Sequence, residues 1–221
     1  MVLLTYDSYK IHKKYYTVLP TQFSVLHNGI DTTKFYKLAL HEKTEIKKTL
    51  ESSDKTIFVW CSQDRPKKGV KLILDVWKRI FKERKNIQLW VIGVASDKQI
   101  NGVRFLGRVP NDDLPKYYQV ADCYLFPTLW QEGFGLSLIE ALHCGCYCIA
   151  AQIGGVPEVL DYGRYGKLID NPHFIDSWVS AIDEFLNEPL VFEPISKEKY
   201  SMNQWNSDMN KIISEAKINI E

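Results

Sequence analysis

The residues most suited to chemistry lie in a glycine-rich stretch that carries two glutamates. Its centre reads Glu132-Gly133-Phe134-Gly135-Leu136, and a second glutamate, Glu140, follows after seven intervening residues. A strand is predicted before this stretch, at residues 123–126, and a helix after it, at residues 136–144. Glycine lets a backbone approach a ligand closely, and the start of a helix presents free N–H groups and a positive dipole end. The combination indicates a phosphate site, although a Gly-x-Gly turn before a helix is also common where nothing binds.

The two glutamates suit hydroxyl groups on either side of a bound phosphate. Glu140 lies about one turn into the predicted helix, where its carboxylate can accept hydrogen bonds from a pair of hydroxyls such as a ribose diol. Glu132 precedes the loop and can hold the hydroxyls of a sugar, while Ser137 adds a hydroxyl donor. A single glutamate on a helix is usually solvated, but the apolar first turn here is predicted to be buried. We therefore expect a nucleotide at one end of the loop and a sugar at the other.

A second candidate is a basic loop between a predicted strand at residues 56–61 and a predicted helix at residues 70–84. The loop contains Arg65, Lys67 and Lys68. Such a cluster can neutralise a diphosphate and stabilise a departing nucleotide. A solvated basic loop is the alternative interpretation. Because both candidate loops follow strands that should end at one edge of a sheet, their pairing favours a functional role.

Two further loops carry weaker signals. Asn28-Gly29 is a turn dipeptide, and its simplest interpretation is a loop. Gly107-Arg108-Val109-Pro110 follows a predicted strand and can offer backbone groups to a base, but taken alone it is better explained as a plain loop into the helix that follows.

Short apolar runs alternate with amphipathic stretches along the chain. This alternation predicts an α/β fold, a Rossmann-like doubly wound parallel sheet that binds ligands beyond the carboxyl ends of its strands. The predicted strands are residues 24–27, 56–61, 88–92, 103–106, 123–126 and 147–150. The predicted helices are residues 42–50, 70–84, 112–120, 136–144, 156–160, 175–187 and 203–216.

The balance of charges argues against a nucleic-acid partner. Lys and Arg number 28 against 27 for Asp and Glu, a formal net charge of +1, whereas nucleic-acid binders usually show a basic excess. No apolar run approaches the length of a membrane span, and the apolar start at residues 1–4 is too short for a signal peptide. We therefore expect a cytoplasmic protein, and peripheral association with a membrane stays compatible with the sequence.

Three of the five cysteines, Cys144, Cys146 and Cys148, alternate along an apolar stretch. A metal cluster is one hypothesis for them. Metal sites use wider spacings and usually add histidine, and His143 beside Cys144 would not face it on a helix. Buried, reduced thiols in a strand are the favoured interpretation, and no metal site is predicted.

The two ends of the chain differ from its middle. Residues 1–20 combine tyrosines and lysines without a full βαβ unit, so they are interpreted as a strand and helix left from another domain, or as a linker. Residues 21–188 are predicted to form the sheet domain. Residues 189–221 begin with prolines that break the helical pattern and end in an amphipathic helix.

Taken in order, several motifs resemble those of retaining glycosyltransferases of family four, in the nucleotide-sugar-binding C-terminal domain of their GT-B fold. The stretch from Glu132 to Glu140 matches the E-x7-E signature of that family. The resemblance covers about residues 20–170, with weaker likeness at the last helix. The other matching segments are Asn28-Gly29-Ile30-Asp31 with Phe35, Pro66-Lys67-Lys68-Gly69, Val103-Arg104-Phe105-Leu106-Gly107, Ala121-Asp122-Cys123-Tyr124-Leu125-Phe126-Pro127-Thr128 and Gly154-Gly155-Val156-Pro157-Glu158-Val159.

This resemblance implies a role for each matching residue. Glu140 should bind the ribose, Glu132 the donor sugar and Lys68 the diphosphate, and Glu132 and Lys68 are the expected catalytic groups. The remaining expected donor contacts are the loop residue Gly133, the phosphate-binding backbone amides of Phe134, Gly135 and Leu136, and Gly93, Arg108 and Val109 near the base.

The resemblance also implies the reaction. The family moves a hexose, with retention, from a nucleotide-diphosphate sugar such as a UDP- or GDP-hexose to an acceptor. It needs no metal and no further cofactor, because cationic side chains and helix ends stabilise the diphosphate. The departing phosphate assists the incoming hydroxyl on the same face of the sugar.

Two departures from the family pattern affect the expected activity. The family usually has Gly-Arg where this chain has Ser62-Gln63, and Arg65 is the candidate to replace that arginine. The N-terminal domain that binds a glycan or lipid-linked acceptor is expected to be missing beyond residues 1–20, so another domain or a partner subunit would supply it. We therefore expect weak or absent transferase activity from this chain alone.

Two other hypotheses stay open at this point. One is a non-catalytic nucleotide-binding or interaction module that has lost the acceptor domain, which Gln63 mildly favours and the pair of Glu132 and Glu140 disfavours. The other is a different nucleotide-sugar enzyme of the same fold, such as an epimerase, whose motifs differ from those above. Nucleotide binding without turnover, restored by a partner domain, would separate a transferase from a module.

Overall fold

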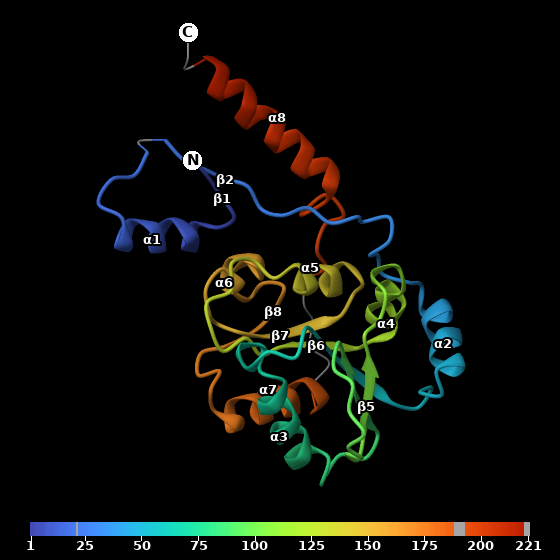
Figure 1. Cartoon of the computed structure of the whole chain (residues 1–221). Coiled ribbons are helices and arrows are strands. Elements are labelled where there is room, and N and C mark those ends of the chain that lie inside the picture. The colour runs from blue at the N-terminus through green and yellow to red at the C-terminus, as the bar shows by residue number, and fades with distance from the viewer. Residues whose placement is uncertain (21, 188–192, 219–221) are drawn as a thin grey trace.

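The centre of the molecule is one parallel sheet of six strands (Figure 1). The computed structural model describes residues 1–20, 22–187 and 193–218. The strand order is β5-β4-β3-β6-β7-β8, and every neighbouring pair is parallel. The strands are β3 (Thr56–Cys61), β4 (Ile87–Ile92), β5 (Val103–Gly107), β6 (Cys123–Phe126), β7 (Tyr147–Ala151) and β8 (Gly166–Ile169).

Helices cover both faces of this sheet (Figure 1). On one face α3 and α7 pack against each other, and on the other face lie α4, α5 and α6, with α2 beside α4. The helices are α2 (Leu40–Thr49), α3 (Val70–Ile80), α4 (Leu114–Val120), α5 (Leu136–His143), α6 (Val156–Val159) and α7 (Ile175–Asn187). The predicted α/β, Rossmann-like doubly wound fold is confirmed.

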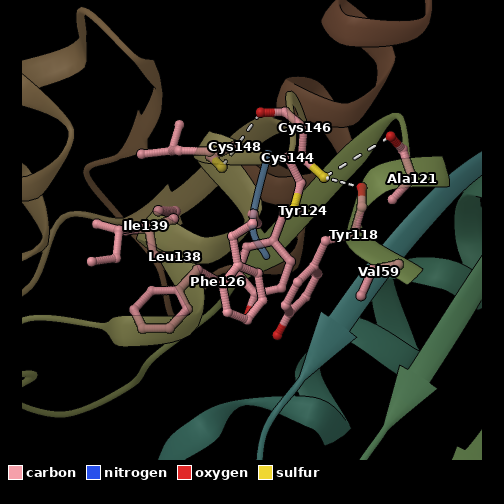
Figure 2. Close-up of a cluster of buried hydrophobic side chains, with 14 of the residues drawn as sticks. Val59, Tyr118, Ala121, Tyr124, Phe126, Leu138, Ile139, Cys144, Cys146 and Cys148 are labelled. Atoms are coloured by element: carbon pink, nitrogen blue, oxygen red, sulfur yellow. Dashed lines mark hydrogen bonds between the residues drawn. The ribbon is translucent and has the colours of Figure 1, made fainter. Parts of the chain in front are cut away.

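Side chains that alternate along the strands build one hydrophobic cluster on each face of the sheet. Within β3, Val59 belongs to the cluster under α4 and α5, whereas Trp60 belongs to the cluster under α3 and α7. Figure 2 shows part of the first cluster, in which Tyr118 and Tyr124 pack edge to face with ring centroids 5.6 Å apart. Because both faces are buried, the strands are apolar at nearly every position, which is why the sequence pattern locates them.

Cys144, Cys146 and Cys148 are buried in this first cluster (Figure 2). The Cys146 thiol contacts the carbonyl oxygen of Tyr118 at 3.1 Å, and burial raises its pKa to about 12, so it stays protonated. The prediction of buried, free thiols is confirmed, but only Cys148 lies in a strand, since Cys144 ends α5. Within the described ranges, no three His, Cys, Asp or Glu side chains gather closely enough to hold a metal ion.

Several observed elements of the sheet domain differ from the predicted ones. No strand is predicted at β8, because this four-residue edge strand contains a glycine and a lysine among its apolar residues. Helix α3 ends at Ile80 instead of residue 84, and turns lead from there into β4. The helix predicted from residue 112 begins as a separate 3-10 turn, Asn111–Asp113, because Pro115 near the start of α4 has no N–H to continue the ladder.

Residues 1–20 form a strand and a helix, as one of the two interpretations predicts. Strand β1 (Val2–Leu3) pairs in parallel with β2 (Ser24–Val25), which is shorter than the predicted 24–27. Between them lies α1 (Tyr6–Tyr15), whose N-terminus is capped by the Thr5 side chain. Helix α8 (Met202–Ile218) projects from the sheet domain on the same side as α1 (Figure 1).

Two further predictions bear on the organisation of the whole chain. The domain boundary predicted between residues 188 and 189 lies outside the described residues. In the part of the chain that the structure describes, no helix is both long and apolar enough to cross a membrane.

Candidate functional site

A cleft lies at the point where the strand order reverses. Strands β4 and β5 extend the sheet from one side of β3, and β7 and β8 extend it from the far side of β6. Loops that leave the carboxyl ends of strands diverge at such a switch point and form a crevice for ligands. Here the cleft has a volume of about 630 Å³ and lies between the basic loop after β3 and the glycine-rich loop after β6. Of the predicted donor-site residues, it is lined by Arg65, Lys68, Glu132, Gly135, Leu136 and Glu140.

The basic loop is fixed by its backbone. Its last residues form a 3-10 turn, Pro66–Lys68, and Gly69 then adopts a φ of +71°. A Cβ atom at Gly69 would lie 2.0 Å from the carbonyl oxygen of Pro127, so only glycine allows the two loops to approach this closely. The indole N–H of Trp60 donates to the Lys68 carbonyl at 3.0 Å. These contacts hold Lys68 at the edge of the sheet with its side chain in the cleft.

Lys68 and Glu132 form an ion pair within the cleft. Their side chains are 22% and 18% exposed, so water only partly screens the pair. The Lys68 ammonium also lies 5.9 Å from the centre of the Phe126 ring. An anion that enters the cleft therefore meets a positioned cation, and it competes with Glu132 for that cation.

Helix α5 begins directly at the glycine-rich loop. Gly135 has a φ of +95°, and the first helical bond runs from the Leu138 N–H to the Gly135 carbonyl at 3.0 Å. The amides of Leu136 and Ser137 precede that bond and belong to residues that line the cleft. Amides at the first turn of a helix have no partner inside it, and the helix dipole favours an anion there. The geometry therefore suits a phosphate group.

Glu140 has an unusual environment on the same helix. Burial raises its pKa to about 7, and the nearby Tyr118 hydroxyl offsets part of this rise. The Tyr124 hydroxyl lies 2.8 Å from the Ser137 hydroxyl and 3.2 Å from the Cys61 carbonyl, so Ser137 is held in place at the start of α5. Glu140, one turn further on, can change protonation state near neutral pH.

A second pair of glycines, Gly154 and Gly155, packs against the backbone of the glycine-rich loop. The Gly155 N–H donates to the Glu132 carbonyl at 2.8 Å. A Cβ atom at Gly154 would lie 2.4 Å from the carbonyl oxygen of Glu132, and one at Gly155 would lie 2.5 Å from that of Gly133. The Gly154-Gly155 motif therefore has a packing role, which is to hold the backbone that carries Glu132.

Glu158, in α6, connects residues 1–20 to the site, and sequence reasoning assigned it no role. Its carboxylate accepts a hydrogen bond from the Tyr6 N–H at 2.8 Å and lies 2.8 Å from the Nε2 atom of His27. The His27 ring stacks on Phe134 of the glycine-rich loop, with centroids 5.5 Å apart. The N-terminal segment is therefore joined to the loop that carries Glu132.

Five predicted donor contacts lie outside the lining of the cleft: Gly93, Arg108, Val109, Gly133 and Phe134. The Gly93 N–H donates to the last carbonyl of β5 at 2.7 Å, so the ends of β4 and β5 are joined. Val109 packs partly on the core and Arg108 is exposed, while Phe134 is only 2% exposed. Their contact with a donor stays a prediction.

The cleft also contains residues that the sequence did not single out. Lys34, from the segment after β2, forms a 2.8 Å salt bridge with Asp112, which precedes α4. Tyr118 lines the cleft as well, and so does Asp31, the last residue of the matching segment Asn28-Gly29-Ile30-Asp31. The only nearby signal in the sequence was the Asn28-Gly29 turn, which says nothing about which strand end the following residues will reach.

The doubly wound sheet with a charged cleft at its switch point defines a Rossmann-like ligand-binding domain. A comparison with protein families places the chain among its relatives. The chain belongs to the family of glycosyl transferases group 1, whose family model matches residues 41–204.

Two curated relatives are identical to this chain at about a quarter of the aligned residues. The phosphatidyl-myo-inositol mannosyltransferase of Mycobacterium tuberculosis is 27% identical over 150 residues, which cover 64% of this chain and 38% of that protein. A GDP-mannose-dependent monoacylated alpha-(1-6)-phosphatidylinositol monomannoside mannosyltransferase of Corynebacterium glutamicum is 27% identical over 185 residues, covering 76% of this chain and 48% of the relative. The chain thus spans less than half the length of either protein.

Solved structures share the fold at lower identity. HepE of Anabaena, in complex with UDP and glucose, superposes with a TM-score of 0.81 at 18% identity, covering 97% of this chain and 62% of HepE. The C-terminal domain of a glycosyl transferase group 1 family protein of Francisella tularensis superposes with a TM-score of 0.61 at 20% identity, covering 73% of this chain and 89% of that domain.

Proposed function

We propose that this chain is the donor-binding part of a retaining glycosyltransferase that moves a hexose from a nucleotide-diphosphate sugar to a glycan or lipid-linked acceptor. The observation that carries the proposal is the convergence of Lys68, Glu132, Glu140 and the N-terminus of α5 on one cleft. The curated relatives that are named as mannosyltransferases acting on phosphatidylinositol compounds support a GDP-hexose donor and a lipid-linked acceptor. A UDP-hexose is the other candidate donor, since the structure of HepE contains UDP.

Each group in the cleft has a role in this proposal. The Glu140 carboxylate accepts hydrogen bonds from the ribose diol, and the amides at the start of α5 bind the diphosphate. Lys68 and the exposed Arg65 neutralise the diphosphate as negative charge builds on it. Glu132 leaves its pair with Lys68 to hold the hydroxyls of the sugar. Because these cations neutralise the diphosphate in place of a metal ion, the proposed donor binding is independent of Mg²⁺.

The proposed chemistry conserves atoms and charge at the anomeric carbon. The bond between that carbon and the diphosphate oxygen breaks, and its electron pair leaves with the nucleoside diphosphate. The acceptor hydroxyl bonds to the same carbon on the same face and passes its proton to the departing phosphate. The acceptor would be bound by a further domain or a partner subunit, so we expect little turnover from residues 1–221 alone.

Replacing Glu140 tests the nucleotide site directly. In calorimetric titrations with UDP, GDP and ADP and their glucose and mannose conjugates, we expect one base to bind, equally with and without Mg²⁺. Glu140→Ala should weaken this binding at least about tenfold, or ~1.4 kcal/mol, because the ribose loses its acceptor. Glu83→Ala, at an exposed residue after α3, is the matched control. No binding of any of these ligands to the unmodified chain would refute the proposed donor site.

The raised pKa of Glu140 makes donor affinity depend on pH. A ribose diol donates hydrogen bonds, so it prefers the ionised carboxylate, and the affinity should rise as pH increases through about 7. If only the ionised form binds, the affinity increases roughly tenfold between pH 6 and 8. The nucleotide sugar is the ligand to titrate, because a free diphosphate has a terminal phosphate that itself titrates near pH 6. A Glu140→Gln variant should show a flat profile, and a variant profile as steep as the wild type would assign the titration to another group.

A non-catalytic nucleotide-binding or interaction module is the second candidate. The exposed Gln63, which stands in the cleft where the resembling family has arginine, favours it. The calorimetric experiment does not separate the two, but a turnover assay with an added acceptor domain does. Restored sugar transfer supports the transferase, and donor binding that never leads to transfer supports the module.

A further inference from the structure

A second cavity lies on the other side of the segment that follows β2. Its volume is about 530 Å³, and it lies between residues 32–37, the C-terminal end of α5 and residues 194–197. Phe35 lines both this cavity and the donor cleft, so residues 31–37 form a shared wall. The volume falls within the range of about 300–1,000 Å³ that is usual for small-molecule sites. Nothing in the proposed donor binding uses this cavity.

The walls of this cavity are largely apolar. Its apolar residues are Phe35, Tyr36, Leu142, Pro194 and Ile195. Tyr36 is 45% exposed, so part of its ring is available to a ligand in the cavity. The His143 Nε2–H donates to the Lys199 carbonyl at 2.8 Å, and burial lowers the pKa of His143, so this side chain adds no charge at neutral pH.

The charged lining is entirely positive. Lys37 and Lys197 are exposed and lie on opposite segments of the wall. No aspartate or glutamate is present among the described residues that line the cavity. An apolar hollow with two cations at its edge is complementary to an apolar body that carries one anionic group, because the body removes apolar surface from water and the anion meets the ammonium groups.

We propose that this cavity is a second ligand site, distinct from the donor cleft, for a small anionic amphiphile. The ligand class is an aromatic or acyl body with a single carboxylate, sulfonate or phosphate. The apolar part lies against Phe35, Leu142 and Ile195, and the anion pairs with Lys37 and Lys197.

The proposal is tested with 8-anilinonaphthalene-1-sulfonate, an aromatic sulfonate that fluoresces in apolar surroundings. Titrated into the whole chain, the dye should bind one saturable site. Lys37→Glu should weaken its binding at least about fivefold by replacing a cation with an anion, and Tyr36→Ala should do the same by removing an apolar wall. Both residues are exposed, and circular dichroism checks that the variants fold.

Matched controls separate this site from other surfaces. The dye affinity should stay unchanged in Lys71→Glu and in Tyr162→Ala. Lys71 is an exposed lysine on α3 and Tyr162 an exposed tyrosine, and neither lines the cavity. UDP and GDP at saturating concentration should not displace the dye. Equal dye binding to all variants, binding that never saturates, or displacement by either nucleotide would each overturn the proposal, and none of these outcomes depends on transferase activity.

Discussion

Replacing Lys68 by methionine is expected to weaken nucleotide-sugar binding roughly 30- to 100-fold, or about 2–3 kcal/mol. A hydrogen bond to a charged group contributes about 1.5–3 kcal/mol, and here two effects add. The diphosphate loses its cation, and Glu132 stays as an uncompensated carboxylate beside it, because its only salt-bridge partner among the described residues is Lys68. Calorimetry on the folded variant measures the loss.

The neighbouring Lys67 provides the matched control. It belongs to the same 3-10 turn but is exposed and does not line the cleft, so Lys67→Met should change affinity less than about twofold. Glu132→Gln should change the affinity for a free diphosphate in the opposite direction. Because it releases Lys68 from the ion pair, the free diphosphates UDP or GDP should bind more tightly, while the sugar conjugates lose part of that gain. Equal losses in Lys67→Met and Lys68→Met would reduce the basic loop to a diffuse positive patch.

The second large effect is on stability, and it comes from Asp122. This carboxylate precedes β6 and accepts bonds from Lys43 and Lys47 of α2, at 2.8 and 2.7 Å, and from the Ile57 N–H of β3 at 2.8 Å. Its side chain is 24% exposed. Asp122→Ala would leave the Ile57 N–H without its acceptor. It would also leave two partly shielded ammonium groups without their counter-charge, with only the Ala121 and Lys55 carbonyls still accepting from them. We expect a loss of about 3 kcal/mol in the free energy of unfolding, and roughly 6–12 °C in Tm.

The pH dependence of this loss has a defined sign. Burial by itself raises the pKa of Asp122, but the two lysines and the Ile57 N–H outweigh it, so the folded-state pKa is lowered below its usual 3.8. The stabilisation is therefore present above about pH 4 and disappears as pH falls through the folded pKa. Denaturant titrations should show a constant gap between the wild type and Asp122→Asn from pH 5 to 8, and a shrinking gap below pH 4.

Asp54→Ala is the control for this prediction. Asp54 is 80% exposed and pairs only loosely with Lys55, at 3.4 Å. Its loss should cost less than about 0.5 kcal/mol at any pH in this range. A similar cost for Asp54 and Asp122 would mean that the Asp122 network is too well solvated to join α2 to the sheet.

Local patterns closely predicted the strands with continuous apolar runs and the helices with an apolar face. Thr56–Cys61, Cys123–Phe126 and Ile175–Asn187 match the predicted bounds, because continuous apolar runs and a 3.6-residue period are properties of short segments. The two strands without predicted bounds are short. Strand β8 has four residues, one of them a glycine and one a lysine, and β1 has only two, so neither has a period that a sequence can display.

For the candidate site, too, the sequence predicted one part and not the other. That the basic loop and the glycine-rich loop meet at one edge followed from the sequence, because parallel strands in a doubly wound sheet end together. The ion pair between the two loops did not follow from the sequence. The contact between Lys68 and Glu132 joins residues 64 positions apart, and it depends on Gly69 packing against Pro127.

The sequence by itself therefore determined the fold class, the family motifs and the loops that carry Glu132, Glu140 and Lys68. Only the tertiary structure decided which groups face one another: Lys34 with Asp112, His27 with Glu158 across 131 positions, and the second cavity behind Phe35. The physical reason is that periodicity and turn chemistry act within a few residues. Contacts between distant segments depend on how the complete helices and strands pack, and no single segment contains that information.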